Sequence, residues 1–82
     1  ARPGPLNNLG NVHYTLGDFE QAVSYWEKSL NVAPGQIDAR LNLAKLHYER
    51  GRLKPAAAQL EEVLRRDPGN AKARVLHKRM IE

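Results

Sequence analysis

The chain has 82 residues, of which 41% are hydrophobic and 27% are charged, and its formal net charge is +4. These values are ordinary for one small globular domain and exclude a disordered or fibrous chain. No apolar run approaches the ~18 residues that a membrane-spanning helix needs. Cysteine is absent, which excludes disulfides and thiol chemistry.

The first residues predict that the chain is a fragment of a larger protein. Residues 1–5 contain neither an initiator Met nor the apolar stretch of a signal peptide. The compartment therefore stays open, with the cytoplasm slightly favoured for a soluble domain.

Five helices are predicted in chain order, because apolar residues recur at steps of three and four and Gly or Pro separates the segments. They are expected near residues 6–16, 19–32, 37–50, 53–66 and 71–81. Asp18 with Gln21 can cap the second helix, and Asn70 can cap the last. The fold class is therefore all-α.

Each helix presents an apolar stripe. The first helix is expected to present Leu6, Leu9, Val12 and His13. The second is expected to bury Phe19, Ala22, Val23, Trp26 and Leu30. On the fourth, Glu61 with Arg65 and Glu62 with Arg66 are acid-before-base pairs four residues apart, typical of a solvated face.

The chain also repeats itself at an offset of 34 residues. Residues 3–36 align with residues 37–70, and ten positions are identical, among them Asn8 with Asn42, His13 with His47, and Gly17 with Gly51. A fixed period of this length is typical of stacked helical units.

The spacing resembles the tetratricopeptide repeat family. The first unit matches the family pattern at Leu6, Leu9, Gly10, His13, Gly17, Phe19, Ala22, Trp26, Ser29 and Pro34. The second has, at the corresponding positions, Arg40, Leu43, Ala44, His47, Gly51, Leu53, Ala56, Leu60, Val63 and Pro68. Both units have His where the family prefers Tyr, and the second lacks the aromatic residues.

The resemblance implies a right-handed superhelical solenoid of helical hairpins. One domain, residues 1–82, would contain repeats at 3–36 and 37–70 and a capping helix at 71–82. Lys78 occupies the position of Gly10 and Ala44, where a small residue lets paired helices approach closely. We therefore expect a cap rather than a third hairpin, packed on the second repeat through Ala71, Val75 and Met80.

The resemblance further implies a concave groove, lined by the first helix of each unit, that binds a peptide or protein. The implied groove residues are Asn7, Asn11, Tyr14, Thr15, Asp38, Leu41, Asn42, Lys45, Tyr48, Glu49, Lys72, Val75 and Arg79. Spacing agrees independently, since Asn7, Asn11 and Tyr14 share one helix face, as do Leu41, Lys45 and Tyr48. The predicted function is a non-enzymatic scaffold or adaptor.

One subclass of the family binds the C-terminal carboxylate of chaperone peptides with a clamp of basic and Asn side chains. Asn11, Asn42 and Lys72 match three clamp positions, whereas Asn7 and Leu76 replace two cations. The loss of two charges argues against this clamp.

Catalysis, metals and cofactors are not expected. His13 and His47 lie at equivalent positions of successive repeats and His77 lies elsewhere, so convergence on one ion is disfavoured. Thr15, Ser24 and Ser29 lack a His at a spacing typical of a nucleophile and its base.

Two alternative functions stay open. A basic last helix, with Lys72, Arg74, Lys78 and Arg79, could bind nucleic acid or an anionic surface. An apolar repeat end around Leu6 could support self-association.

Overall fold

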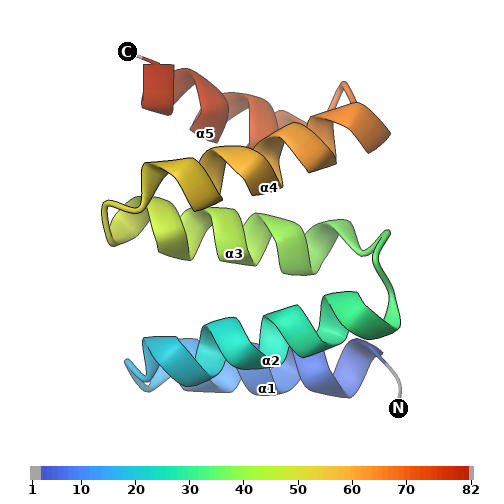
Figure 1. The fold of residues 1–82 in the computed structure, drawn as a ribbon, viewed down its shortest axis with the longest axis vertical. Coiled ribbons are helices and arrows are strands. Elements are labelled where there is room, and N and C mark those ends of the chain that lie inside the picture. Colours follow the sequence, from blue (N-terminus) through green and yellow to red (C-terminus); the bar gives the residue numbers. More distant parts are fainter. Residues whose placement is uncertain (1–2, 82) are drawn as a thin grey trace. The chain divides into compact units, whose positions relative to one another are not determined.

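The computed structural model describes residues 3–81, and within that range it contains five α-helices and no strand (Figure 1). The helices are α1 (Pro3–Thr15), α2 (Phe19–Val32), α3 (Ile37–Glu49), α4 (Leu53–Arg66) and α5 (Ala71–Ile81). The all-α prediction is confirmed. None of these helices combines the length and the apolar character that crossing a membrane requires.

Helix α1 begins at Pro3, three residues before the predicted start at Leu6. Pro3 and Pro5 both fall in its first turn, where backbone N–H groups have no partner within the helix. The two prolines therefore cost the helix no hydrogen bond, and the helix can begin at Pro3.

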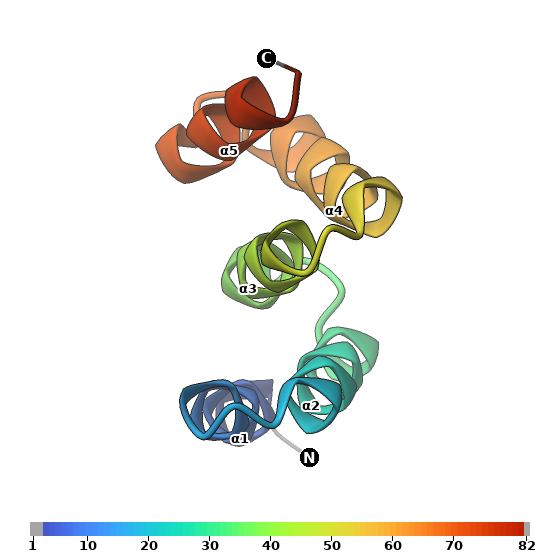
Figure 2. The same cartoon turned by 90° about the vertical axis from the view of Figure 1, so that its left-hand side faces the viewer.

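The helices belong to two compact units, Ala1–Ala39 and Arg40–Glu82, and each unit is described on its own. In the first unit, α1 and α2 lie side by side as an antiparallel hairpin (Figures 1 and 2). In the second unit, α4 lies between α3 and α5 along the stack, and Figure 2 shows α3 and α5 on the same side of it.

Both hairpins turn at a glycine with positive φ, Gly17 at 80° and Gly51 at 75°. The N–H of Gly17 donates to the carbonyl of Tyr14 at 3.0 Å, and the N–H of Asp18 donates to the carbonyl of His13 at 2.8 Å. The second turn repeats both bonds at the same distances, from Gly51 to Tyr48 and from Arg52 to His47. These are Schellman turns, which explains why glycine recurs at this position of the repeat.

The first hairpin depends on a close contact between Gly10 of α1 and Trp26 of α2. A Cβ added to Gly10 would lie 2.4 Å from Cδ1 and Nε1 of the indole. Trp26 is 2% exposed and Ala22 is fully buried. A small residue is thus required on α1, as predicted, and the group that requires it is the indole ring.

The predicted apolar stripe of α1 is partly wrong. Leu9 is 41% exposed and Val12 is 52% exposed, because the face of α1 that meets α2 runs through Gly10 and Tyr14 instead. Leu16, four residues after Val12, is also exposed.

The predicted core of α2 needs a smaller correction. Ala22 and Trp26 are buried as expected, whereas Phe19, Val23 and Leu30 are only half-buried. Ser29 is fully buried, and its hydroxyl donates to Oε1 of Gln36 at 2.5 Å, which satisfies this buried polar group. On α2 the small polar residue Ser29 is therefore more deeply buried than the larger apolar residues.

The core of the second unit uses all three of its helices. The fully buried residues of α4 are Ala56, Leu60 and Val63, α5 contributes Ala73, and the part of α3 in this unit contributes Leu43 and Ala44, with Leu46 at 1% exposure. Arg40 of α3 also donates to Oε1 of Gln59 of α4 at 2.9 Å, which joins these two helices.

The predicted packing face of α5 is partly wrong. Ala73 is its one fully buried residue among those described, and Met80 is half-buried. Ala71 and Val75, which were expected to pack, are exposed, Val75 at 54%. The buried register steps from Ala73 by three and four residues, so positions 71 and 75 point away from it.

The helix caps differ between the units. Asp18 Oδ1 accepts from the N–H of Gln21 at 3.4 Å, and Asn70 Oδ1 accepts from the N–H of Ala73 at 2.9 Å, so Asp18 and Asn70 cap these helices as predicted. Arg52, at the equivalent position before α4, makes no side-chain cap.

The predicted ion pairs of α4 are half correct. Arg66 Nε lies 3.2 Å from Oε1 of Glu62, as expected. Arg65 also pairs with Glu62, three residues before it, instead of with Glu61. One carboxylate therefore serves both guanidinium groups.

Candidate functional site

Four of the predicted groove residues lie on α1, where the indole of Trp26 organises two of them. Trp26 Nε1 donates to the backbone carbonyl of Asn7 and to Oδ1 of Asn11, both at 3.2 Å. Asn11 is exposed, but the hydrogen bond from Trp26 holds the oxygen of its side chain in place. The hydroxyl of Thr15 donates to the carbonyl of Asn11 at 3.0 Å.

Tyr14 completes this part of α1. Its ring lies 5.8 Å from that of Phe19 and 5.9 Å from that of Trp26, in tilted arrangements favourable for aromatic pairs. Tyr14 is consequently half-buried rather than fully exposed. The structure thus brings Asn7, Asn11 and Tyr14 together around one indole.

Helix α3 carries six more predicted groove residues. Asp38, Lys45 and Glu49 are exposed, and the half-buried ones are Leu41, Asn42 and Tyr48. The fully buried positions of α3 fall between them, so α3 has a core face and an outward face. The spacing of Leu41, Lys45 and Tyr48 places them on the outward face.

On α5 the predicted residues Lys72, Val75 and Arg79 are all exposed. The helix contains four basic residues and no acidic one, and its first turn is fixed by Asn70. Asn70 also donates from Nδ2 to Oδ2 of Asp67 at 3.2 Å, which orients the capping amide.

The histidines do not form a common site. His13 stacks on Tyr25, with ring centroids 5.3 Å apart and planes 9° from parallel. Its Nδ1 lies 3.4 Å from Oδ2 of Asp18 without hydrogen-bond geometry. Among the described residues, no group of three His, Cys, Asp or Glu side chains is placed to hold a metal ion.

The ring of Tyr25 contacts two neighbouring side chains. His13 stacks on the ring, and Nζ of Lys28 lies 5.1 Å from the ring centroid. The second contact is a cation–π interaction on an exposed surface. These contacts give Tyr25 a local structural explanation.

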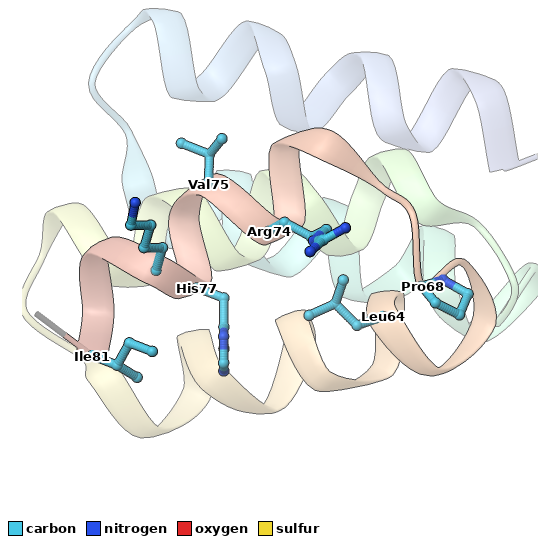
Figure 3. Close-up of a pocket in the computed structure, with 7 residues that line it drawn as sticks. Leu64, Pro68, Arg74, Val75, His77 and Ile81 are labelled. Atoms are coloured by element: carbon cyan, nitrogen blue, oxygen red, sulfur yellow. The ribbon is translucent and has the colours of Figure 1, made fainter.

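A groove between α4 and α5 was not predicted from the sequence. It has a volume of about 630 Å³, and Figure 3 shows Leu64 and Pro68 on one wall facing residues of α5. The signal that could have revealed it is the interleaving of apolar and basic residues in α5, where Arg74 and Val75 are adjacent and Lys78 precedes Ile81 by three.

A comparison with protein families decides the identity of the fold. The family model for the tetratricopeptide repeat matches residues 4–68. The chain belongs to the tetratricopeptide repeat family. The match covers both Schellman turns and the Gly10–Trp26 contact. No curated protein matched the chain in a search for individual relatives.

Membership gives the general role of the chain. Tetratricopeptide repeats generally act as protein–protein interaction modules and are typically non-catalytic scaffolds. The family match therefore directs attention to the outward faces of α1, α3 and α5.

Proposed function

We propose that the chain is a non-enzymatic scaffold or adaptor that binds a peptide segment of a partner protein. The contact surface is the outward face of the first helices, with α1 contributing Asn7, Asn11, Tyr14 and Thr15. On this proposal residues 1–82 act as one domain, with repeats at 3–36 and 37–70 and a capping helix at 71–82.

The observation that carries the proposal is the anchoring of Asn11. Its Oδ1 accepts from Trp26, so the amide stands at an exposed position in one orientation. An Asn amide both donates and accepts, which suits the backbone of an extended peptide without selecting its side chains. A side chain held in place loses less entropy on binding than a mobile one.

The exposure of the other residues also supports the proposal. None of the predicted contact residues on α1, α3 or α5 is buried. Tyr14 and Tyr48 are half-buried, and a Tyr held in this way offers a large contact area with few rotatable bonds. The two missing cations at Asn7 and Leu76 make a carboxylate clamp the weaker version of peptide binding.

The test is a selection of binding peptides from a displayed random library on the purified chain, followed by calorimetric titration of the selected peptides. We expect Asn11→Ala and Asn42→Ala each to weaken binding by about tenfold or more, a change of ~1.4 kcal/mol. Asn31→Ala, at an exposed position of α2, is the matched control and should leave the affinity unchanged. Equal affinity for all three variants would refute the proposed surface.

A further inference from the structure

We infer that the groove between α4 and α5 is a second binding surface, for an extended acidic peptide segment with apolar anchor residues. It shares Val75 with the predicted contact residues of α5, but its other lining residues lie outside the surface of the proposed function; they are Leu64, Pro68, Arg74, His77, Lys78 and Ile81 (Figure 3).

The floor of the groove is apolar and open to solvent. On α5, Ile81 is 73% exposed and Val75, which points away from α4 in Figure 3, is 54% exposed, whereas Leu64 of α4 is half-buried. Among the described residues of the second unit, the exposed large hydrophobic ones are Val75, Ile81 and Leu53. Exposed apolar residues gathered in a groove indicate a contact site more strongly than scattered ones do.

The rim of the groove is positively charged. Arg74 and Lys78 line it and are both exposed, and His77 lies between them in the sequence. Helix α5 has no acidic residue, and the carboxylate of Glu62 on α4 already pairs with Arg65 and Arg66. Asp67, next to the groove, accepts a hydrogen bond from Asn70, and no carboxylate of the described residues pairs with Arg74 or Lys78. A ligand that complements the charge of this rim is therefore acidic.

The room above Lys78 suits an extended segment better than a helix. In the first unit the equivalent position is Gly10, and even a methyl group there would lie 2.4 Å from the indole of the paired helix. A Lys at this position keeps a second helix from packing on α5 as α2 packs on α1. Its aliphatic stem can still line the groove while the ammonium stays at the rim.

The spacing of the two cations matches an extended chain. Arg74 and Lys78 are four residues apart on one helix, a separation of ~6 Å along the helix axis. Side chains on the same face of an extended strand, at i and i+2, are ~6.6 Å apart. Two acidic residues at i and i+2 can therefore meet both cations, while the intervening residue faces away, and flanking apolar residues reach Val75 and Ile81.

The experiment uses the whole chain and a twelve-residue peptide whose binding face carries Glu at two successive positions, i and i+2, with Leu or Val at the flanking positions of that face. Backbone amide and methyl resonances are followed by NMR during titration, and affinities are measured by calorimetry. Two control peptides replace every Glu by Gln, or every Leu and Val by Ser. A single-stranded RNA of twelve nucleotides tests the competing class of ligand.

The inference predicts resonance changes at Leu64, Val75 and Ile81, and binding to the acidic apolar peptide that both control peptides lose. The double variant Arg74→Glu with Lys78→Glu should weaken binding at least about tenfold, because two attractive pairs become repulsive. The matched double variant Arg52→Glu with Lys54→Glu makes the same change in net charge at exposed positions outside both the groove lining and the surface of the proposed function. It should weaken binding much less, and circular dichroism confirms that both variants fold.

Three outcomes would overturn the inference. Equal losses for the two double variants would show general electrostatic attraction, and tighter binding of the RNA would assign the rim to nucleic acid. Resonance changes confined to α1 and α3 would place the peptide on the surface of the proposed function, which would then stand without this second site. Failure of the proposed function, by contrast, is read from Asn11→Ala and Asn42→Ala, which lie outside the groove lining.

Discussion

The indole nitrogen of Trp26 donates a hydrogen bond to the side-chain oxygen of Asn11, 3.2 Å away on the facing helix. The bond joins a residue that is 2% exposed to one that stands at the surface. It links the packing of the first hairpin to the placement of a residue that we propose binds the partner. Stability and binding can therefore be separated by substitutions at this one position.

Asn11→Ala removes one of the two acceptors of the indole N–H and leaves the carbonyl of Asn7. We expect the free energy of unfolding to fall by about 0.5–1.5 kcal/mol, measured by urea denaturation. Asn8→Ala, at an exposed position of the same helix, corrects for the gain in helix propensity. Asn11→Asp keeps an acceptor oxygen and loses the amide donor, so it should retain more stability while it weakens peptide binding. An equal stability loss at positions 8 and 11 would contradict the role of the bond.

Gly10→Ala should destabilise the chain although alanine is the better helix former. The new Cβ would lie 2.4 Å from two atoms of Trp26, and overpacking of this kind costs about 1–3 kcal/mol. That exceeds the ~1 kcal/mol that alanine gains over glycine in a helix. Gly4→Ala is the matched control, since nothing lies within 4 Å of its Cβ, and it should leave stability unchanged or raise it. Thermal unfolding followed by circular dichroism distinguishes the two, and a higher midpoint for Gly10→Ala would refute the contact.

Arg52→Asp should stabilise the second unit. Arg52 precedes α4 and makes no capping bond, whereas Asp18 before α2 caps Gln21. An Asp at this position supplies the acceptor and places a negative charge at the positive end of the helix, for a gain of about 1 kcal/mol. Arg52→Ala removes the cation without adding an acceptor and should show no such gain. If both variants are equally stabilised, repulsion among basic residues is the cause instead of the cap.

Glu62 should contribute to stability in a pH-dependent way. The hydrogen bond from Arg65, reinforced by the charge of Arg65 and by Arg66, lowers the pKa of the Glu62 carboxyl below its ordinary value of 4.5. A lowered pKa in the folded state means that the contribution is fully present above pH 4.5 and is lost as the pH falls through the folded-state value. Glu62→Gln should therefore be less stable than the parent near pH 7, and the difference should shrink under acid conditions.

The control for this series is Glu61→Gln, which changes the neighbouring carboxylate on α4. Arg65 pairs with Glu62 and not with Glu61 in the structure. Urea denaturation at several pH values should show a smaller and flatter effect at position 61. A stability difference at position 62 that grows as the pH falls would contradict the ion pair.

Helix boundaries were predictable because the residues that end helices act locally. Gly17 and Gly51 adopt the positive φ of a Schellman turn, and Asp18 and Asn70 cap the helices that follow. Each of these effects is decided within about four residues of the chain. The start of α1 was missed because Pro3 and Pro5 suggest a break where the first turn in fact accepts them.

The faces of α1 and α5 were less predictable because each helix offers two apolar registers. In α5 one register contains Ala71 and Val75, and the other contains Ala73 and Met80. Spacing alone does not choose between them, since the choice depends on the shape of α4 beneath. In the structure Ala73 is the buried residue, whereas Val75 is 54% exposed.

The spacing of the sequence also did not predict which carboxylate of α4 pairs with Arg65. Glu61 and Glu62 both lie within reach of a basic residue one turn later, and only side-chain conformations assign Arg65 to Glu62. The groove between α4 and α5 is likewise a product of two facing surfaces. A pattern read along one helix does not show what the neighbouring helix leaves uncovered.

The chain contains one tryptophan, and it lies in the buried interior of the first unit. Its intrinsic fluorescence is therefore a built-in reporter for that unit alone, whereas far-ultraviolet dichroism sees the helices of both. Unfolding transitions that coincide by the two signals would mean that the hairpins melt as one cooperative block. Separate transitions would mean that the repeats act as semi-independent links, whose coupling could be measured without attaching any label.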